Sequence, residues 1–117
     1  MRILTLATTA FLTLMTAGFA HAHAFLDHAE PRVGSKVAAA PTEVVLFYSQ
    51  NLEAAFSSIE VSDANGARVD QGKPRISAST MRVGVKALPP GTYRVRWQVL
   101  SVDTHTTEGN FSFTVGP

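Results

Sequence analysis

The sequence predicts an all-β protein, an immunoglobulin-like Greek-key β-sandwich or barrel of about seven strands. Apolar and polar residues alternate at every second position from Thr42 onward, and turn-forming residues separate the alternating runs. No segment repeats its apolar residues with the 3.6-residue period of an amphipathic helix. A chain of 117 residues is long enough for one such domain, and we expect no second core.

The first 22 residues differ from the rest and predict a cleaved secretory signal peptide. Arg2 is the only charged residue before Asp27, and mostly small and apolar residues lie between them. The run is short, contains threonines and has no basic flank on its far side, which argues against a membrane anchor. Ala20-His21-Ala22 matches the cleavage pattern, so His23 is expected to begin a mature domain of residues 23–117. Cleavage after Ala20 is the alternative.

The composition of the mature domain limits its functions. The chain has 10 basic and 9 acidic residues, and removal of Arg2 leaves equal numbers. A neutral domain offers no electrostatic attraction for nucleic acid or an anionic membrane. Because no second hydrophobic segment that could act as an anchor follows the leader, we expect a soluble exported protein, and we expect it to be a monomer. The absence of cysteine excludes disulfides and thiolate metal sites. Met81 alone remains after cleavage, which excludes a thioether cluster for Cu(I).

The first half of the mature chain predicts strands and the connections between them. Residues 30–41 read as a loop that leads to a first edge strand. Residues 43–49 alternate, with Val44, Leu46 and Tyr48 on one face. Residues 51–58 are expected to form one helical turn or a wide connection between sheets. A strand around Val61 then precedes Asn65-Gly66, a strong hairpin turn.

The second half predicts three more strands. Residues 81–88 alternate, and Pro89-Pro90-Gly91 then forms a turn. The following run is the clearest of all, because Tyr93, Val95, Trp97 and Val99 alternate with polar residues and are expected to face the core. The last run, residues 109–115, directs its phenylalanines inward in the same way.

Three residues are candidate metal ligands. Asp103 and His105 are two residues apart, so in extended chain their side chains leave the same face. An N-terminal His23 would add an α-amine and an imidazole from a single residue. Three nitrogens and one carboxylate oxygen suit tetragonal Cu(II) better than Zn(II) or Cu(I). We therefore expect one Cu(II) per chain, bound by His23, Asp103 and His105.

Simpler interpretations of these residues stay open. Asp103 could orient His105 on the surface without any metal, and His23 could reflect the ordinary composition of a leader's end. If cleavage follows Ala20, His23 would be the third residue of an amino-terminal chelate. His28 is expected to be a surface or structural histidine, and Glu108 either accepts a proton from an imidazole or lies on the surface.

The chain resembles the CopC family of periplasmic copper-binding proteins. The resemblance extends from His23 to Val115 and is most specific in the N-terminal histidine, in "GTYRVRW", and in the Asp-x-His followed by "G-x-F-x-F-x-V". It implies a Greek-key β-fold and a histidine-brace Cu(II) site, with His23, Asp103 and His105 as ligands. It also implies a CopD-like inner-membrane copper transporter as partner. Unlike some members, this chain has no methionine between residues 51 and 62, and Gln50 stands where many have an acidic residue.

The expected function follows from this site. The sequence predicts a periplasmic Cu(II)-binding protein that buffers copper or delivers it to a membrane transporter, and that is not an enzyme. A copper oxidative enzyme is one alternative, because a histidine brace also activates oxygen in copper polysaccharide monooxygenases. A metal-free β-sandwich used for protein interaction is the other.

Overall fold

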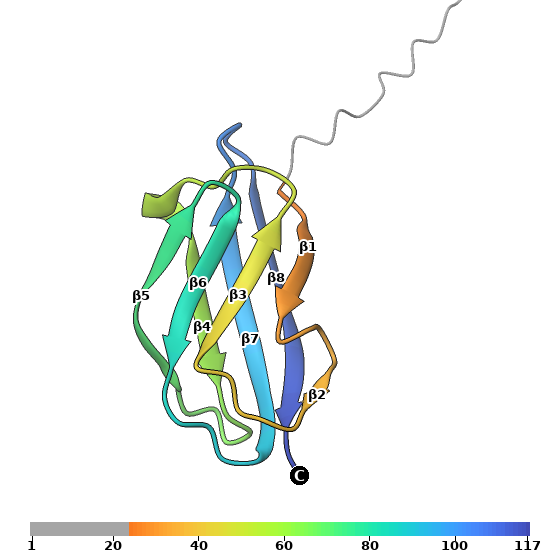
Figure 1. Cartoon of the computed structure of the whole chain (residues 1–117). Coiled ribbons are helices and arrows are strands. Elements are labelled where there is room, and N and C mark those ends of the chain that lie inside the picture. The colour runs from red at the N-terminus through yellow and green to blue at the C-terminus, as the bar shows by residue number, and fades with distance from the viewer. Residues whose placement is uncertain (1–23) are drawn as a thin grey trace, which may run out of the picture.

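Residues 24–117 are described in the computed structural model, and they form two four-stranded β-sheets packed face to face (Figure 1). One sheet has the order β1-β3-β6-β5 and the other β2-β8-β7-β4, with every pairing antiparallel except β2 with β8. Within this range no helix has the length and apolar character needed to cross a membrane. The elements are β1 (Leu26–Glu30), β2 (Lys36–Val37), β3 (Glu43–Tyr48), the 3-10 turn η1 (Ala54–Phe56), β4 (Ser58–Ser62), β5 (Asp70–Ser77), β6 (Thr80–Val85), β7 (Gly91–Leu100) and β8 (Thr106–Val115).

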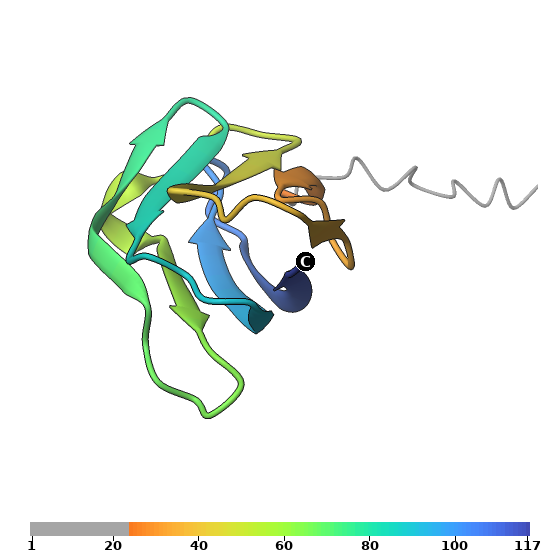
Figure 2. The ribbon, with the colours of Figure 1, turned by 60° about the horizontal axis from the view of Figure 1, so that its bottom comes forward.

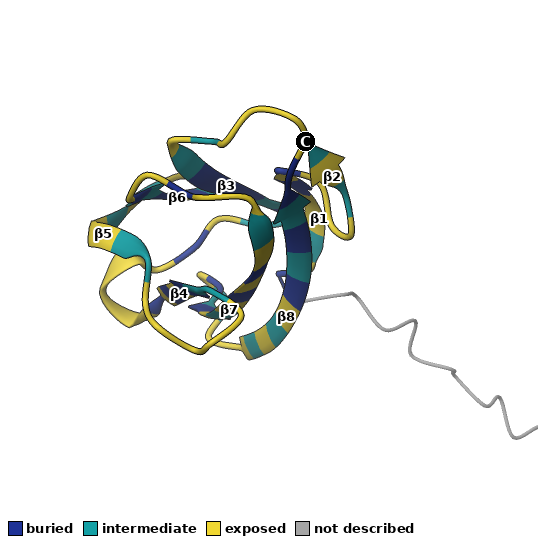
Figure 3. Ribbon diagram, turned by 90° about the horizontal axis from the view of Figure 1, so that it is seen from below, coloured by how far each residue is buried: buried dark blue, intermediate teal, exposed yellow. Residues whose placement is uncertain are grey.

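The predicted alternation creates the hydrophobic core between the two sheets. Buried positions alternate with more exposed ones along the inner strands, except in β3, where Val45 is buried between Val44 and Leu46 (Figure 3). A tilted view shows the two sheets as separate layers (Figure 2), and the buried residues pack into one core cluster between them. The predicted β-sandwich is therefore confirmed. Its core includes Val44, Leu46, Tyr48, Met81, Val83, Tyr93, Val95, Val99, Phe111, Phe113 and Val115.

The number of strands differs from the expectation, because the described range has eight where about seven were predicted. The pattern did not reveal β1 and β5, at opposite edges of the same sheet, or β2, an edge strand of the other sheet within the stretch that was expected to be a loop. β5 buries none of its residues and contains Gly72 and Pro74, which are unusual in inner strands. β1 buries only Ala29. Edge strands that contribute little to the core leave no clear alternation in the sequence.

The Asn65-Gly66 turn forms as predicted, but the hairpin around it is short. Gly66 has a φ of 86°, and its backbone N–H donates to the carbonyl of Asp63. The two arms then separate, because β4 pairs with β7 while β5 crosses to the other sheet. Asp70 joins the arms where they diverge: its Oδ1 accepts the backbone N–H of Val61 at 2.9 Å and Nε of Arg68 at 2.8 Å.

Replacing Asp70 with alanine is expected to destabilise the domain by about 1–3 kcal/mol at neutral pH, because its partners lose a charged acceptor. Partial burial raises the pKa of Asp70, but the hydrogen bonds from Arg68 and Val61 outweigh it and leave the pKa lowered. A lowered pKa gives stability that is present above about pH 4, the unfolded value, and is lost as pH falls through the folded value. Thermal unfolding of D70A and of the exposed control E53A at pH 7 and pH 3 checks this. A D70A deficit of the same size at pH 7 and at pH 3 would contradict it.

Trp97 packs against the core without being fully buried. Its ring meets that of Tyr48 edge-on, with 5.2 Å between the centroids. On the neighbouring strand, Gly109 pairs directly with Trp97, and a Cβ placed on Gly109 would lie 2.6 Å from Trp97 Cζ2. Only a hydrogen at this position leaves room for the indole.

Gly109→Ala is expected to destabilise the domain by about 1–3 kcal/mol, because the indole must leave its rotamer or push the strands apart. Gly84→Ala is the matched control, since its Cβ would meet the nearest atom at an ordinary 3.6 Å. Urea unfolding followed by the fluorescence of the single tryptophan reports both stability and ring environment. Equal midpoints for the two variants would refute the steric argument.

Candidate metal centre

Asp103 and His105 lie in the tight connection between β7 and β8. The connection is closed by two backbone hydrogen bonds, from Ser101 N–H to the carbonyl of His105 at 3.0 Å and from Thr104 N–H to that of Ser101 at 2.9 Å. Thr104 takes the left-handed conformation, with a φ of 73°, which turns the chain between the two candidate ligands. The two side chains lie close together, as the sequence predicts, but a turn brings them together instead of an extended chain.

The pair combines a carboxylate and an accessible imidazole. His105 Nδ1 lies 3.5 Å from Asp103 Oδ1, and the side chains are 50% and 29% exposed, respectively. The hydroxyl of the fully buried Ser101 donates to Asp103 Oδ1 and is the main cause of a lowered pKa at Asp103. The backbone N–H of His105 lowers this pKa further. Asp103 is therefore held in the ionised form that binds a cation.

The N-terminal segment enters the fold beside this pair. His23 lies outside the described residues, but Ala24 directly after it is fully buried. The carbonyl of Ala24 accepts a hydrogen bond of 2.8 Å from Oγ1 of Thr107, two residues beyond His105. Phe25 and Ser49 exchange two further hydrogen bonds, both of 2.9 Å. Figure 1 shows the start of β1 and the β7–β8 connection at the same end of the sandwich.

The described residues alone do not make a complete metal site. Among residues 24–117, no three His, Cys, Asp or Glu side chains gather closely enough to hold a metal ion. Asp103 and His105 thus supply one oxygen and one imidazole at the point where the N-terminal segment joins the domain. A third His, Cys, Asp or Glu ligand would therefore have to come from outside residues 24–117.

The other polar candidates have separate surroundings. His28 stacks on Phe47, with ring centroids 4.2 Å apart and planes inclined by 7°, and its Nδ1 lies 2.7 Å from Asp27 Oδ2. These contacts give His28 a structural role at the sheet surface. Glu108 is exposed on the outer face of β8, where it pairs with Gln98 of β7.

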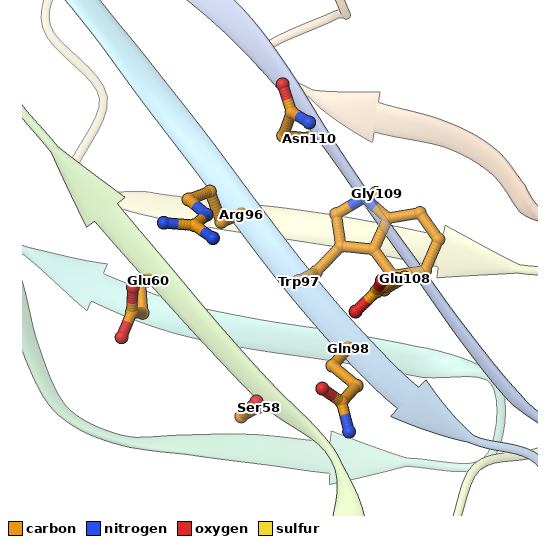
Figure 4. Close-up of a pocket in the computed structure, with 8 residues that line it drawn as sticks. All are labelled: Ser58, Glu60, Arg96, Trp97, Gln98, Glu108, Gly109 and Asn110. Carbon is orange, nitrogen blue, oxygen red and sulfur yellow. The ribbon is translucent and has the colours of Figure 1, made fainter.

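A polar groove of about 420 Å³ crosses the outer face of β4, β7 and β8 (Figure 4). Arg96 and Glu60 line it from neighbouring strands, and Trp97 closes one side over Gly109. The groove does not include Asp103 or His105. Its mixed charges and open shape are those of an ordinary solvated sheet face, so the ligand pair at the end of the sandwich is the stronger candidate site.

The fold defines the class of this protein: it is a two-sheet β-sandwich, with a carboxylate–imidazole pair at one end. Comparisons with known proteins identify the family within that class. A family model described as the CopC domain matches residues 26–116. The chain is 34% identical over 117 residues to copper resistance protein C of Escherichia coli, covering 92% of each chain. It is 35% identical to the crystal structure of CopC from Methylosinus trichosporium OB3b, with a TM-score of 0.76, covering 81% of this chain and 95% of that one.

A third relative is much longer. The chain is 31% identical over 99 residues to the copper transport protein CutJ of Bacillus subtilis, covering 81% of this chain but 18% of CutJ. Together these matches show that the chain belongs to the CopC family, as the sequence motifs indicated. Members of this family are named for copper resistance and copper transport.

Proposed function

We propose that this protein binds one Cu(II) ion in the periplasm and buffers it or delivers it to a membrane copper transporter. The observation that carries the proposal is the meeting of Asp103 and His105 with the N-terminal segment, which Thr107 holds through Ala24. Cleavage after Ala22 would make His23 the N-terminal residue, one peptide unit from that anchored position. Its amine and imidazole would then complete a set of three nitrogens and one oxygen.

Each proposed ligand has a distinct role. The amine and imidazole of His23 would chelate the ion in one ring, and the His105 imidazole would supply the third nitrogen. Asp103 would contribute an ionised oxygen and offset one of the ion's two positive charges. Because the two nitrogen-donating residues come from different ends of the sequence, binding would also fasten the N-terminal segment to the β7–β8 connection.

The proposed delivery of copper is supported by the organisation of a relative. In CutJ, a segment similar to this chain forms less than a fifth of a protein named for copper transport. A binding domain joined to a transport protein is a natural arrangement for passing an ion between them. A separate domain of the same family would do so by docking, with a CopD-like inner-membrane protein as the proposed recipient.

The proposal is tested by titrating the exported protein with Cu(II), Cu(I) and Zn(II), each in competition with a chelator of known affinity. One equivalent of Cu(II) is expected to bind, with much weaker binding of Zn(II) and Cu(I), because the donors are nitrogen and carboxylate and no thiolate is present. Tighter binding of Cu(I) than of Cu(II), or no copper binding, would contradict the proposal. Turnover of a reductant with peroxide release would favour an oxidative enzyme instead.

A further inference from the structure

Charged residues are distributed unevenly along the sandwich. We call the end formed by residues 24–27, 49–57 and 101–107 the metal end. It contains three acidic residues, Asp27, Glu53 and Asp103, and no lysine or arginine. All nine basic residues of the described range lie elsewhere, on the strands and connections between positions 32 and 96. A domain that is neutral as a whole therefore has one negative end, and its three negative charges still exceed the two positive charges of one bound Cu(II) ion.

The same end also exposes most of the large apolar side chains on the surface. Four such side chains are exposed among residues 24–117, and three of them lie here: Phe25 at 47%, Phe56 at 67% and Val102 at 52%. The fourth, Val33, lies outside this end, in the connection between β1 and β2, next to Gly34, whose N–H donates to the carbonyl of Ser112 in β8. Single exposed apolar residues are common, but several at one end of a small domain indicate an interaction site.

Backbone hydrogen bonds tie the three segments of the metal end together. Glu53 N–H donates to the carbonyl of Leu100 at 2.8 Å, and Val102 N–H donates to that of Asn51 at 3.1 Å. Ser49 N–H donates to the carbonyl of Phe25 at 2.9 Å. The exposed apolar side chains thus project from a connected backbone, and a preorganised surface loses little conformational entropy on binding.

We propose that the metal end is the docking surface for the protein that exchanges copper with this chain, and that this partner presents an apolar surface edged by lysine or arginine. The inference rests on the proposed copper function, since it places the partner over Asp103 and His105. Apolar contact would provide affinity, and opposite charge would orient the two proteins.

The charge of this end disfavours the other occupants. A second copy docked through the same end would bring two sets of acidic residues together, and like charges at an interface oppose association. Anionic lipid headgroups would be repelled in the same way, because attraction to such a surface requires basic residues. A basic partner protein is the occupant that satisfies both the apolar and the acidic character.

The test is photo-crosslinking in the native host, with p-benzoylphenylalanine replacing Phe56, or replacing Val33 in the β1–β2 connection as the matched control. The crosslinked peptide is identified by mass spectrometry. We expect a crosslink from position 56 to another protein, at a peptide containing lysine or arginine beside apolar residues, and none from position 33. Adding Glu53→Lys should reduce the yield about tenfold, whereas Glu30→Lys, away from the metal end, should not.

Several outcomes would overturn the docking proposal. These are a crosslink to a second copy of the chain or to lipid, equal yields from the two positions, no crosslink from position 56, or no effect of Glu53→Lys. Cu(II) titration of the same purified variants separates this test from that of the proposed function. Variants that bind copper normally but fail to crosslink overturn the docking surface alone, whereas a wild-type chain that binds no copper overturns the proposed function.

Discussion

Replacing His105 with alanine is expected to weaken Cu(II) binding by more than about 100-fold while the domain stays folded. The loss follows because the imidazole is one of three proposed nitrogen donors, and half of its side-chain surface is exposed. The connection around it is held through backbone atoms of Ser101, Thr104 and residue 105 itself, which the substitution retains. Competition titration measures the affinity, and thermal unfolding of the apo protein checks the fold.

Asp103→Asn separates charge from shape at the same site. Asparagine keeps an oxygen in place but removes the negative charge that Ser101 and the His105 backbone stabilise. We expect weaker Cu(II) binding, with a smaller loss than for His105→Ala. His28→Ala is the control, because His28 contacts Phe47 and Asp27 instead of the pair. If all three variants bind Cu(II) as tightly as the unmodified chain, copper binds elsewhere. If all three lose the same amount of affinity, the loss reflects a general effect on stability.

Adding one alanine before His23 is expected to have an effect as large as the loss of His105. The α-amine would move by one residue, about 3.8 Å along the chain, so amine and imidazole could no longer chelate from the same residue. The affinity for Cu(II) should fall by more than about 100-fold. Electron paramagnetic resonance of the Cu(II) complex should also show a changed set of nitrogen donors.

Acetylating the amine of the correctly processed chain provides an independent version of this experiment. It removes the donor without lengthening the chain, and the same loss is expected. A chain extended by alanine at its C-terminus serves as the control for added length. If both N-terminal modifications leave the affinity unchanged, the amine is not a ligand, and the proposed role of cleavage after Ala22 is wrong.

Most of the core strands could be predicted from the sequence because buried and exposed residues alternate along them. In β7, Tyr93, Val95 and Val99 are buried, and the residues between them are exposed or half-buried. β5 could not be found in the same way, because Lys73 and Pro74 sit in an edge strand with no buried position. Its location depends on pairing with β6, a long-range contact that a local pattern does not encode.

The candidate site was only partly readable from the sequence. The spacing of Asp103 and His105 predicted that they lie together, and the structure places their side chains 3.5 Å apart. The supporting roles of Ser101 and Thr107 were missed, since a serine or threonine near a ligand has no distinctive pattern. Thr107 acts on Ala24, which is 83 positions away in sequence, so only the folded chain reveals the contact.

The central claim is that a cleaved N-terminal histidine joins Asp103 and His105 around one Cu(II) ion. Native mass spectrometry of the protein exported to a periplasm, with one equivalent of Cu(II) added, tests it most directly. The account predicts a chain that begins at His23 and carries one copper. A chain that begins at His21 with one copper would indicate an amino-terminal chelate without Asp103. A chain that begins at His23 and stays free of copper would contradict the account.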